Sequence, residues 1–434
     1  MHPFFDPFDA AAAIIVCATV FAYINHRLLR LPRTTGLMIM GAVVSVSVTV
    51  LDIWWPSMAT SHAIAGFIRA IDFHDAVMNG MLSFLLFAGA LHVDLSELSR
   101  SKWTIGLITV FGVLISTALI GFVLWGINTL FGAGISLAWC LLFGALISPT
   151  DPVAVLGILK ASRVPAALEA TVAGESLFND GVAIVVFAIL ISVVAGGEAG
   201  PPALTDIGRM FLLQAVGGVA FGAAIGGIAF AAMRAIDEHN LEVMISLALV
   251  MGGYALAHRL GVNGPIAMAV AGLIIGNSGR ALAMSAHTRD YVTKFWSLID
   301  EILNAVLFLL IGLEAIEILD KLPLLLAAIG IIPLVLVARG LSVGLPLLVL
   351  GRHSGLPRGS FSILLLGGVR GGISVALALS LPDGLEKQLV LVSTYGVVLF
   401  SMLIQAPLVG VAARRLYAGT GGDGGEDRGE ERAR

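Results

Sequence analysis

The chain has 434 residues, of which 58% are hydrophobic and only 12% are charged. Because an average soluble domain carries about 25% charged residues, this composition argues against a soluble enzyme and against a disordered chain. The formal net charge of −4 argues against a nucleic-acid-binding protein, which needs a basic surface. The two cysteines, Cys17 and Cys140, lie in apolar runs and indicate neither a disulfide framework nor a zinc site. We therefore predict a polytopic membrane protein.

A helix that spans a membrane needs about 20 mostly apolar residues, and the chain contains thirteen such segments. We predict an all-α fold with about 13 transmembrane helices. No Lys or Arg precedes the first segment, which indicates a retained helix rather than a secretory signal. The Gly-rich, charged residues 418–434 are expected to be a disordered tail. The segments are 10–26, 34–51, 75–92, 103–127, 135–158, 166–195, 210–233, 241–258, 262–277, 295–316, 322–350, 359–381 and 388–413.

The distribution of basic residues predicts the orientation of these segments. Alternate connections hold fifteen Lys and Arg residues, whereas the connections on the other side hold five. Loops rich in Lys and Arg stay in the cytoplasm. We therefore expect a multi-pass protein of the cell (inner) membrane, with its N-terminus outside and its C-terminus in the cytoplasm.

A few charges lie inside the predicted segments, where an ionisable residue costs about 2.5–3.5 kcal/mol on insertion scales. They are three acids, Asp151, Glu175 and Asp180, and two bases, Arg339 and Arg370. If each base neutralises one acid, one carboxylate remains to bind a cation or a proton. This balance predicts an exchanger. Asp300 and Glu301, near the start of 295–316, are weaker candidates for lining an ion entrance, and Glu314 is assigned to the membrane interface.

Two of the predicted segments are interrupted. Pro149 and Pro152 flank Asp151, and proline both removes an N–H and disfavours helical geometry in the residue before it. The glycine-rich run 367–372 surrounds Arg370. If the segments form inverted three-helix repeats at positions 4–6 and 11–13, the interruptions are equivalent. Paired interrupted helices indicate a transporter binding site near the middle of the membrane.

The segment 166–195 adds oxygen atoms to this site. On a helix, Ser176 lies beside Asp180 and Glu175 beside Asn179, because residues four apart share a face. Hydroxyl, amide and carboxylate oxygens suit a small alkali cation. Glu175 is more simply explained as half of a structural ion pair, with either arginine as its partner.

The motifs resemble a known family, the NhaP/NHE-type sodium/proton exchangers (monovalent cation/proton antiporters). Its paired signatures are similar to residues 150–155 and 174–180 of this chain. The similarity extends over about residues 15–410. Three more stretches agree: 263–265 with 271–277, 308–313, and 368–373.

The resemblance implies an NhaA-like antiporter fold with inverted repeats and two crossing, interrupted helices. Within a membrane domain of residues 1–417, it implies a transport core of about 103–195 and 322–413. The remaining part, about 10–92 and 210–316, would form the dimerisation scaffold. It also implies homodimers, an elevator-like movement of the core, and no cofactor besides the transported Na⁺ and H⁺.

By the same resemblance, Asp180 is the carboxylate that binds the ion and the proton. Thr150 and Ser176 supply further oxygens to Na⁺, and Asn179 and Asp151 belong to the same expected ion- and proton-binding set. Asn179 precedes the aspartate, as in electroneutral family members.

The resemblance further implies that Glu175 pairs with Arg339, although the residues alone leave Arg370 open as its partner. Asp151 and Arg370 would balance the charges of the helix ends at the two breaks. One departure stands out, because many bacterial relatives have a glutamate where this chain has Ala88.

We therefore predict exchange of one monovalent cation for one H⁺, with both competing for Asp180. Na⁺ is the expected cation, and Li⁺ and K⁺ stay open. The alternatives are a cation channel and a membrane sensor that does not transport. An intramembrane hydrolase is disfavoured, because no histidine lies in the middle of the core segments.

Overall fold

The computed structural model of the protein describes residues 7–54, 73–132, 134–195, 204–279, 282–314 and 328–417. Helix dominates these ranges, and they contain no strand. The prediction of an all-α fold is confirmed. The expected tail, 418–434, and the first residues of the segment 322–350 lie outside the described residues.

The first half of the chain forms helices up to α10, including two π-helical stretches. Their bounds are α1 Pro7–Ile24, η1 Asn25–Leu29, α2 Arg33–Trp54, α4 Phe73–Asp75, η3 Ala76–Met81, α5 Leu82–Leu91, α6 Leu95–Arg100, α7 Lys102–Leu130, α8 Leu137–Leu146, α9 Val153–Ala161 and α10 Ala166–Ala195.

The second half continues from α11 to α22. Its bounds are α11 Leu204–Arg234, α12 His239–Leu260, α13 Gly264–Ile274, η5 Ile275–Gly279, α15 Ala286–Glu314, α18 Ile331–Leu350, η6 Gly351–Ser354, α19 Ser360–Leu366, α20 Gly372–Leu379, α21 Leu385–Phe400, η7 Ser401–Gln405 and α22 Ala406–Tyr417.

Nine helices within the described residues are long and apolar enough to cross a membrane. The other four predicted segments hold shorter apolar helices, namely η3 with α5, α8 with α9, α13 with η5, and α19 with α20. Each of the thirteen segments therefore contains helix. The number of membrane crossings itself stays a prediction.

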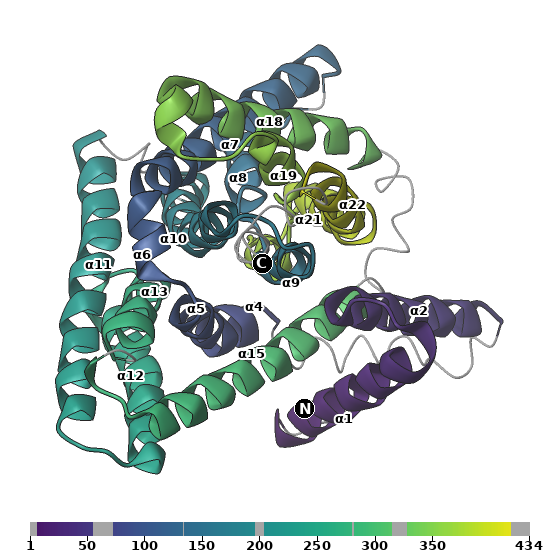
Figure 1. Ribbon diagram of the computed structural model, residues 1–434. Coiled ribbons are helices and arrows are strands. Elements are labelled where there is room, and N and C mark those ends of the chain that lie inside the picture. The colour runs from purple at the N-terminus through teal and green to yellow at the C-terminus, as the bar shows by residue number, and fades with distance from the viewer. Residues whose placement is uncertain are drawn as a thin grey trace, which may run out of the picture.

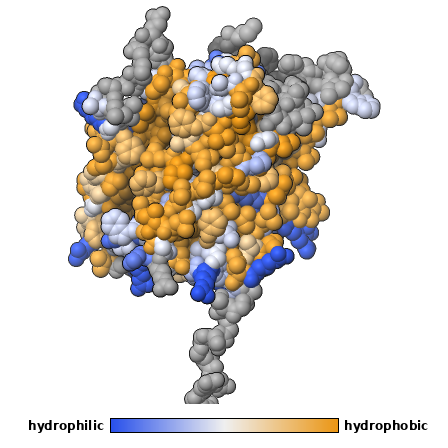
Figure 2. All heavy atoms as spheres, turned by 90° about the horizontal axis from the view of Figure 1, so that it is seen from above, coloured by the Kyte–Doolittle hydropathy of each residue, from blue (hydrophilic) through white to orange (hydrophobic). Residues whose placement is uncertain are grey.

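The outer surface is apolar over a broad area. Figure 2 shows hydrophobic residues across the middle of one face, with hydrophilic residues gathered mainly along one edge. On separate helices, Val16 is 60% exposed, Leu212 60% and Met251 61%. Because a soluble monomer rarely exposes large contiguous apolar patches, this surface suits contact with lipid tails.

Both predicted interruptions are present. The helix stops at Leu146 and resumes at Val153, and Pro149 and Pro152 lie between these residues. The second break covers residues 367–371, where glycines dominate. The freed backbone groups are tolerated in a membrane only beside protein or a cavity, so the rest of the fold must surround both breaks.

The remaining helices do surround them. In Figure 1, α7 to α10 and α18 to α22 form a bundle, while α11, α12, α15, α2 and α1 run along two of its sides. Helix α15 packs along α2, and α13 packs between α5 and α11. Helix α10 contacts α7 and α8 in the bundle as well as α11 and α13 outside it. Helix α10 therefore lies at the boundary between the bundle and the helices along its sides, and its polar side chains can reach that boundary.

Outside the long helices, Asp94 forms the N-cap of α6. Its Oδ1 accepts hydrogen bonds from the hydroxyl and the backbone N–H of Ser96, over 2.6 and 2.8 Å. These bonds lower the pKa of Asp94 below its ordinary value, and the bond from the Ser96 hydroxyl has the larger effect. The cap therefore stabilises the fold above the ordinary pKa, and that stability is lost as the pH falls through the lowered value.

We expect Asp94→Ala to lower the thermal unfolding temperature at neutral pH, because α6 then loses its cap. As the pH is lowered from the ordinary carboxyl pKa of about 3.9 through the lowered value of Asp94, the difference in unfolding temperature between the variant and the unmodified protein should shrink. Unfolding followed by circular dichroism over a series of pH values from neutral to acid measures this. A difference that stays constant over the series would show that the ionised carboxylate is not what stabilises the cap.

Candidate functional site

The two interrupted helices touch at their breaks. The backbone N–H of Asp151 in the first break donates to the carbonyl of Val369 in the second, over 2.7 Å. This bond satisfies two groups that the missing helical turns leave free. Segments more than two hundred positions apart in the sequence are therefore joined by their backbones.

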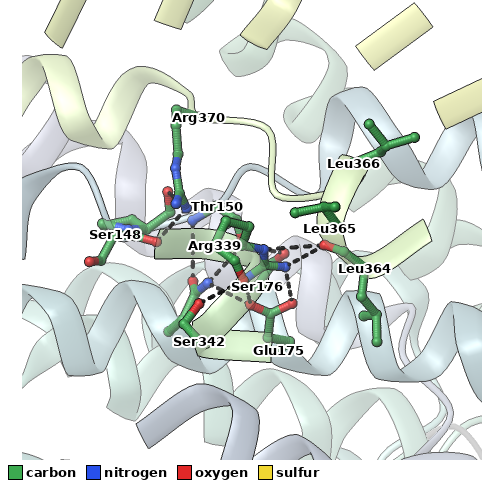
Figure 3. A network of polar contacts seen from close by, with 12 residues as sticks. Ser148, Thr150, Glu175, Ser176, Arg339, Ser342, Leu364, Leu365, Leu366 and Arg370 are labelled. Atoms are coloured by element: carbon green, nitrogen blue, oxygen red, sulfur yellow. Dashed lines mark hydrogen bonds and ion pairs between the residues drawn. The ribbon is translucent and has the colours of Figure 1, made fainter. Parts of the chain in front are cut away.

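Arg370 neutralises the end of α8. Its Nη1 donates to the carbonyls of Ser148 over 2.6 Å and Pro149 over 3.1 Å, and only 1% of the residue is exposed. Figure 3 shows this side chain reaching from one break to the other. The C-terminal end of a helix carries partial negative charge. The guanidinium therefore supplies both the donors and the opposite charge that the interrupted helix lacks.

Asp151 supplies negative charge at the N-terminal ends of α9 and α20. Its Oδ1 accepts a hydrogen bond of 2.8 Å from the N–H of Val153, in the first turn of α9. A Cβ at Gly371 would overlap this carboxylate, so the side chain also lies against the start of α20. N-terminal helix ends carry partial positive charge. Asp151 and Arg370 thus lie at opposite helix poles, in the arrangement that the resemblance implies.

The polar side chains of α10 meet the first break. The hydroxyl oxygens of Thr150 and Ser176 are 2.9 Å apart and share a hydrogen bond. The Nδ2 of Asn179 donates to the Thr150 hydroxyl over 2.7 Å. Asp180 follows on the same helix and is 3% exposed, and its Oδ1 has no hydrogen-bond partner among the described residues. The structure thus brings Thr150, Ser176, Asn179 and Asp180 into one region.

Glu175 forms a buried, two-pronged ion pair with Arg339 rather than with Arg370. The Arg339 Nη2 donates to the Glu175 Oε2 over 2.8 Å, and Nη1 donates to Oε1. Nη2 also donates to the carbonyl of Leu364 on α19, over 2.9 Å. Figure 3 shows Arg339 lying between Glu175 and Leu364. The pair therefore joins α10, α18 and α19. Arg339 is the arginine that Glu175 contacts, which the residues alone had left open.

Gln405 was missed by the sequence analysis. Its Nε2 donates to the carbonyls of Leu365 over 3.3 Å and Leu366 over 2.8 Å, at the C-terminal end of α19. It thus serves the second interrupted helix much as Arg370 serves the first. The available signal was an amide deep within the apolar segment 388–413, away from Gln388 at its start.

A cavity of about 320 Å³ reaches these residues. Thr150, Asp151 and Asp180 line it, together with Ser374 in the first half of α20. The Ser374 hydroxyl is buried and has no partner among the described residues. Asp180 and Ser374 therefore both bring an unpartnered, buried oxygen to the cavity.

The other wall of the cavity comes from α5 and α15. Leu86 on α5 and Asn304 on α15 line it, and His92, Lys160 and Glu301 are among its polar lining residues. Asp300 lines it too, so both acids lie where the weaker suggestion needs them, and their role at an ion entrance stays a prediction. The cavity thus lies between the bundle and the helices along its sides.

Ala88, the position at which the resemblance leads one to expect a glutamate, does not line this cavity. Its side chain is fully buried in a cluster with Phe87, Leu91, Met268 and Trp296. The Ala88 carbonyl contacts the Nδ1 of His92 over 2.7 Å. This chain therefore has apolar packing at position 88.

The count of buried charges from the sequence was too low. Glu242 in the first turn of α12 and Glu314 at the end of α15 are also buried, at 0% and 5% exposure. Both stand near segment ends in the sequence, where interfacial positions are expected. Neither lines the cavity. Asp180 thus combines burial, an unpartnered oxygen and access to the cavity.

Gly371 offers a direct test of the packing at the breaks. A methyl group there would overlap the carboxylate of Asp151, and overpacking costs about 1–3 kcal/mol. We expect Gly371→Ala to lower the unfolding temperature in detergent. Gly227→Ala on α11 is the matched control, because a Cβ there meets nothing within 4 Å. Equal unfolding temperatures for the two variants would contradict the close contact at the breaks.

Crossing broken helices, a buried unpartnered carboxylate and an apolar outer surface define a multi-pass membrane transport protein. A family model described as "Sodium/hydrogen exchanger, transmembrane" matches residues 14–415. The chain belongs to this family, and the resemblance found in the sequence is confirmed.

Individual relatives agree over almost the whole chain. The chain is 51% identical over 416 residues to the Na⁺/H⁺ antiporter NhaP of Pseudomonas aeruginosa, covering 95% of this chain and 97% of that protein. It is 32% identical to the Na⁺/H⁺ antiporter NhaH of Halobacillus dabanensis, covering 93% and 96%. The solved structure of the sodium proton antiporter MjNhaP1 from Methanocaldococcus jannaschii at pH 8 matches with a TM-score of 0.74 at 21% identity, covering 94% and 98%. This last match shows a shared fold.

Proposed function

We propose that this protein is a secondary active transporter that exchanges Na⁺ for H⁺ at Asp180. The observation that carries the assignment is the buried Asp180 carboxylate on the cavity, whose Oδ1 has no hydrogen-bond partner among the described residues. By contrast, Glu175 is held by Arg339, and Asp151 accepts from the start of α9. Members of the family are transporters rather than enzymes and need no cofactor; Na⁺ and H⁺ are their substrates.

The local chemistry fits a small, hard cation. Thr150 and Ser176 supply hydroxyl oxygens close to Asp180, and hard oxygen ligands suit alkali cations. Asn179 holds the Thr150 hydroxyl in place through its amide. Because one carboxylate takes either one Na⁺ or one proton, exchange is 1:1 and moves no net charge.

Coupling follows from the energy of the empty site. With a cation or a proton bound, Asp180 is neutral overall and can cross the membrane barrier. Empty and ionised, it would carry a buried charge that lacks a partner, which is costly in a medium of low dielectric. The empty carrier therefore crosses poorly, and the two fluxes are tied together.

Alternating access would come from movement between two groups of helices. We assign about 103–195 and 322–413 to a moving transport core, and about 10–92 and 210–316 to a scaffold that also forms a homodimer. The position of the cavity supports this division, because Thr150 and Asp180 line it from one side and Leu86 and Asn304 from the other. Sliding of the core would close the cavity at one end and open it at the other.

The cavity would open to the cytoplasm. Lys160 lines it and belongs to the connections rich in Lys and Arg, which stay cytoplasmic under the positive-inside rule. We accordingly place the N-terminus outside and the C-terminus inside the cell membrane. Cysteines introduced singly at Lys160 and Lys387, on opposite predicted sides, test this with a membrane-impermeant thiol reagent on intact cells.

A panel of cations in proteoliposomes tests the function. With an imposed pH gradient, addition of Na⁺ should dissipate the gradient, and Li⁺ and K⁺ in parallel measure the selectivity. Repeating the assay with the membrane potential clamped tests the stoichiometry, because 1:1 exchange is independent of voltage. A cation current driven by voltage alone, without counter-flow of H⁺, would indicate a channel and reject the proposal.

A further inference from the structure

A second and larger cavity, of about 1130 Å³, lies beside the first. It is bounded by α1, the turn that joins α1 to α2, and α15. These helices can be followed along the lower side of Figure 1. Nothing in the exchange mechanism uses it.

One end of this cavity is basic. His26, Arg27, Arg30 and Arg33 line it from the turn. Arg33 forms an ion pair with Glu301 on α15, whereas Arg27 and Arg30 have no ion pair with any described residue. Two cationic side chains are therefore available to an anion.

The turn that carries these arginines is held in one conformation by specific contacts. Arg30 has a φ of 54°, in the left-handed region that side chains other than glycine rarely adopt. The buried amide of Asn25 holds the turn, donating to the carbonyl of Leu31 over 3.0 Å and accepting from its N–H over 3.2 Å. Residues kept in such a conformation are held there by their surroundings and gather at functional sites.

The rest of the cavity is apolar and elongated. Ile15, Ala18 and Ala22 line it from one face of α1, and Ile302 and Val306 line it from α15. At 1.5 Å per residue, the α1 wall from position 15 to the basic turn is about 15 Å long. Ile15 is 52% exposed and Ile302 42%, so the wall opens sideways toward the bilayer.

We propose that this cavity binds an anionic glycerophospholipid. The phosphate lies against Arg27 and Arg30, because guanidinium groups match phosphate with paired, charge-assisted hydrogen bonds. The acyl chains lie along the apolar walls of α1 and α15. A free phosphate ion would satisfy the arginines and leave the apolar walls uncovered, whereas the lipid matches both ends.

The acidic side chains nearby do not oppose this binding. Glu301 is paired with Arg33, and the Oδ1 of Asp300 accepts a hydrogen bond of 3.0 Å from the Nδ2 of Asn304. Asp300, Glu301 and Asn304 line both cavities. A bound lipid would therefore lie next to the mouth of the ion cavity.

Thermal unfolding of the full-length protein in a neutral detergent tests the proposal, with phosphatidylglycerol, phosphatidylcholine or glycerol phosphate added. Because a ligand stabilises the state that binds it, phosphatidylglycerol should raise the unfolding temperature more than the other two. In Arg27→Gln/Arg30→Gln this rise should fall by more than half. The control Arg414→Gln/Arg415→Gln removes two exposed arginines outside the cavity. In this control, phosphatidylglycerol should raise the unfolding temperature as much as in the unmodified protein. An equal rise in both double variants overturns the proposal.

The apolar wall is tested separately with Thr19→Trp, which places a large side chain in the cavity from an exposed position on α1. We expect this variant to lose the phosphatidylglycerol effect as well. Light scattering on the same samples reports whether a second copy of the chain fills the cavity instead. An unchanged lipid effect together with a smaller assembly would overturn the proposal in favour of that second copy. Stabilisation by glycerol phosphate equal to that by phosphatidylglycerol would reduce the site to one for phosphate.

Discussion

Asp180→Asn should reduce Na⁺/H⁺ exchange to the level of vesicles without protein. Asparagine has nearly the same shape as aspartate, but it can neither carry a proton through the cycle nor neutralise a bound cation. The hydroxyls of Thr150 and Ser176 stay in place in the variant but offer no charge. Proton-gradient dissipation by Na⁺ in proteoliposomes measures the loss.

Two further measurements separate this loss from damage to the fold. Na⁺ should raise the unfolding temperature of the unmodified protein and leave that of Asp180→Asn unchanged, because a ligand stabilises only a state that binds it. Asp290→Asn is the matched control, since Asp290 lies on the surface of α15 beside Lys294, and it should exchange normally. Substantial cation uptake coupled to the pH gradient by Asp180→Asn would reject the assignment.

The interruptions of the helices were predictable from the sequence because their causes are local. Pro149 and Pro152 remove backbone donors wherever they stand, and the glycines of the second break carry no Cβ that could clash. That Asp180 places an acid inside a helix was predictable because a charge within an apolar segment is visible in the sequence and costly in a membrane. These features depend on neighbours in the chain, so no tertiary information was needed.

The contact partners of these residues could not be predicted from the sequence. Whether Glu175 meets Arg339 or Arg370 depends on how α18 lies against α10, and helix packing admits several crossing angles. Gln405 and Ser374 belong to residue types that often occur in membrane helices as packing or hydrogen-bonding groups. Their relation to the site appears only when α19 and α20 are placed in space. Glu314 was assigned to the membrane interface, although it is buried, because a position near a segment end does not reveal that other helices cover it.

Breaking the Glu175–Arg339 pair should destabilise the protein strongly. Removing one partner of a buried ion pair leaves the other charge uncompensated and costs about 3–5 kcal/mol. Arg339→Gln should cost more than Glu175→Gln, because Arg339 also holds the carbonyl of Leu364 at the end of α19. Thermal unfolding in detergent ranks the two variants against the unmodified protein.

The double variant Glu175→Gln/Arg339→Gln distinguishes a charge effect from a loss of packing. It contains no unpaired buried charge, and two amides can still hydrogen-bond, so it should be more stable than Arg339→Gln alone. The coupling energy from the four proteins measures the interaction within the pair. A double variant whose loss equals the sum of the two single losses would show that the residues act independently. Recovery of stability without full recovery of exchange would indicate that the pair also keeps α10 and α19 in register for transport.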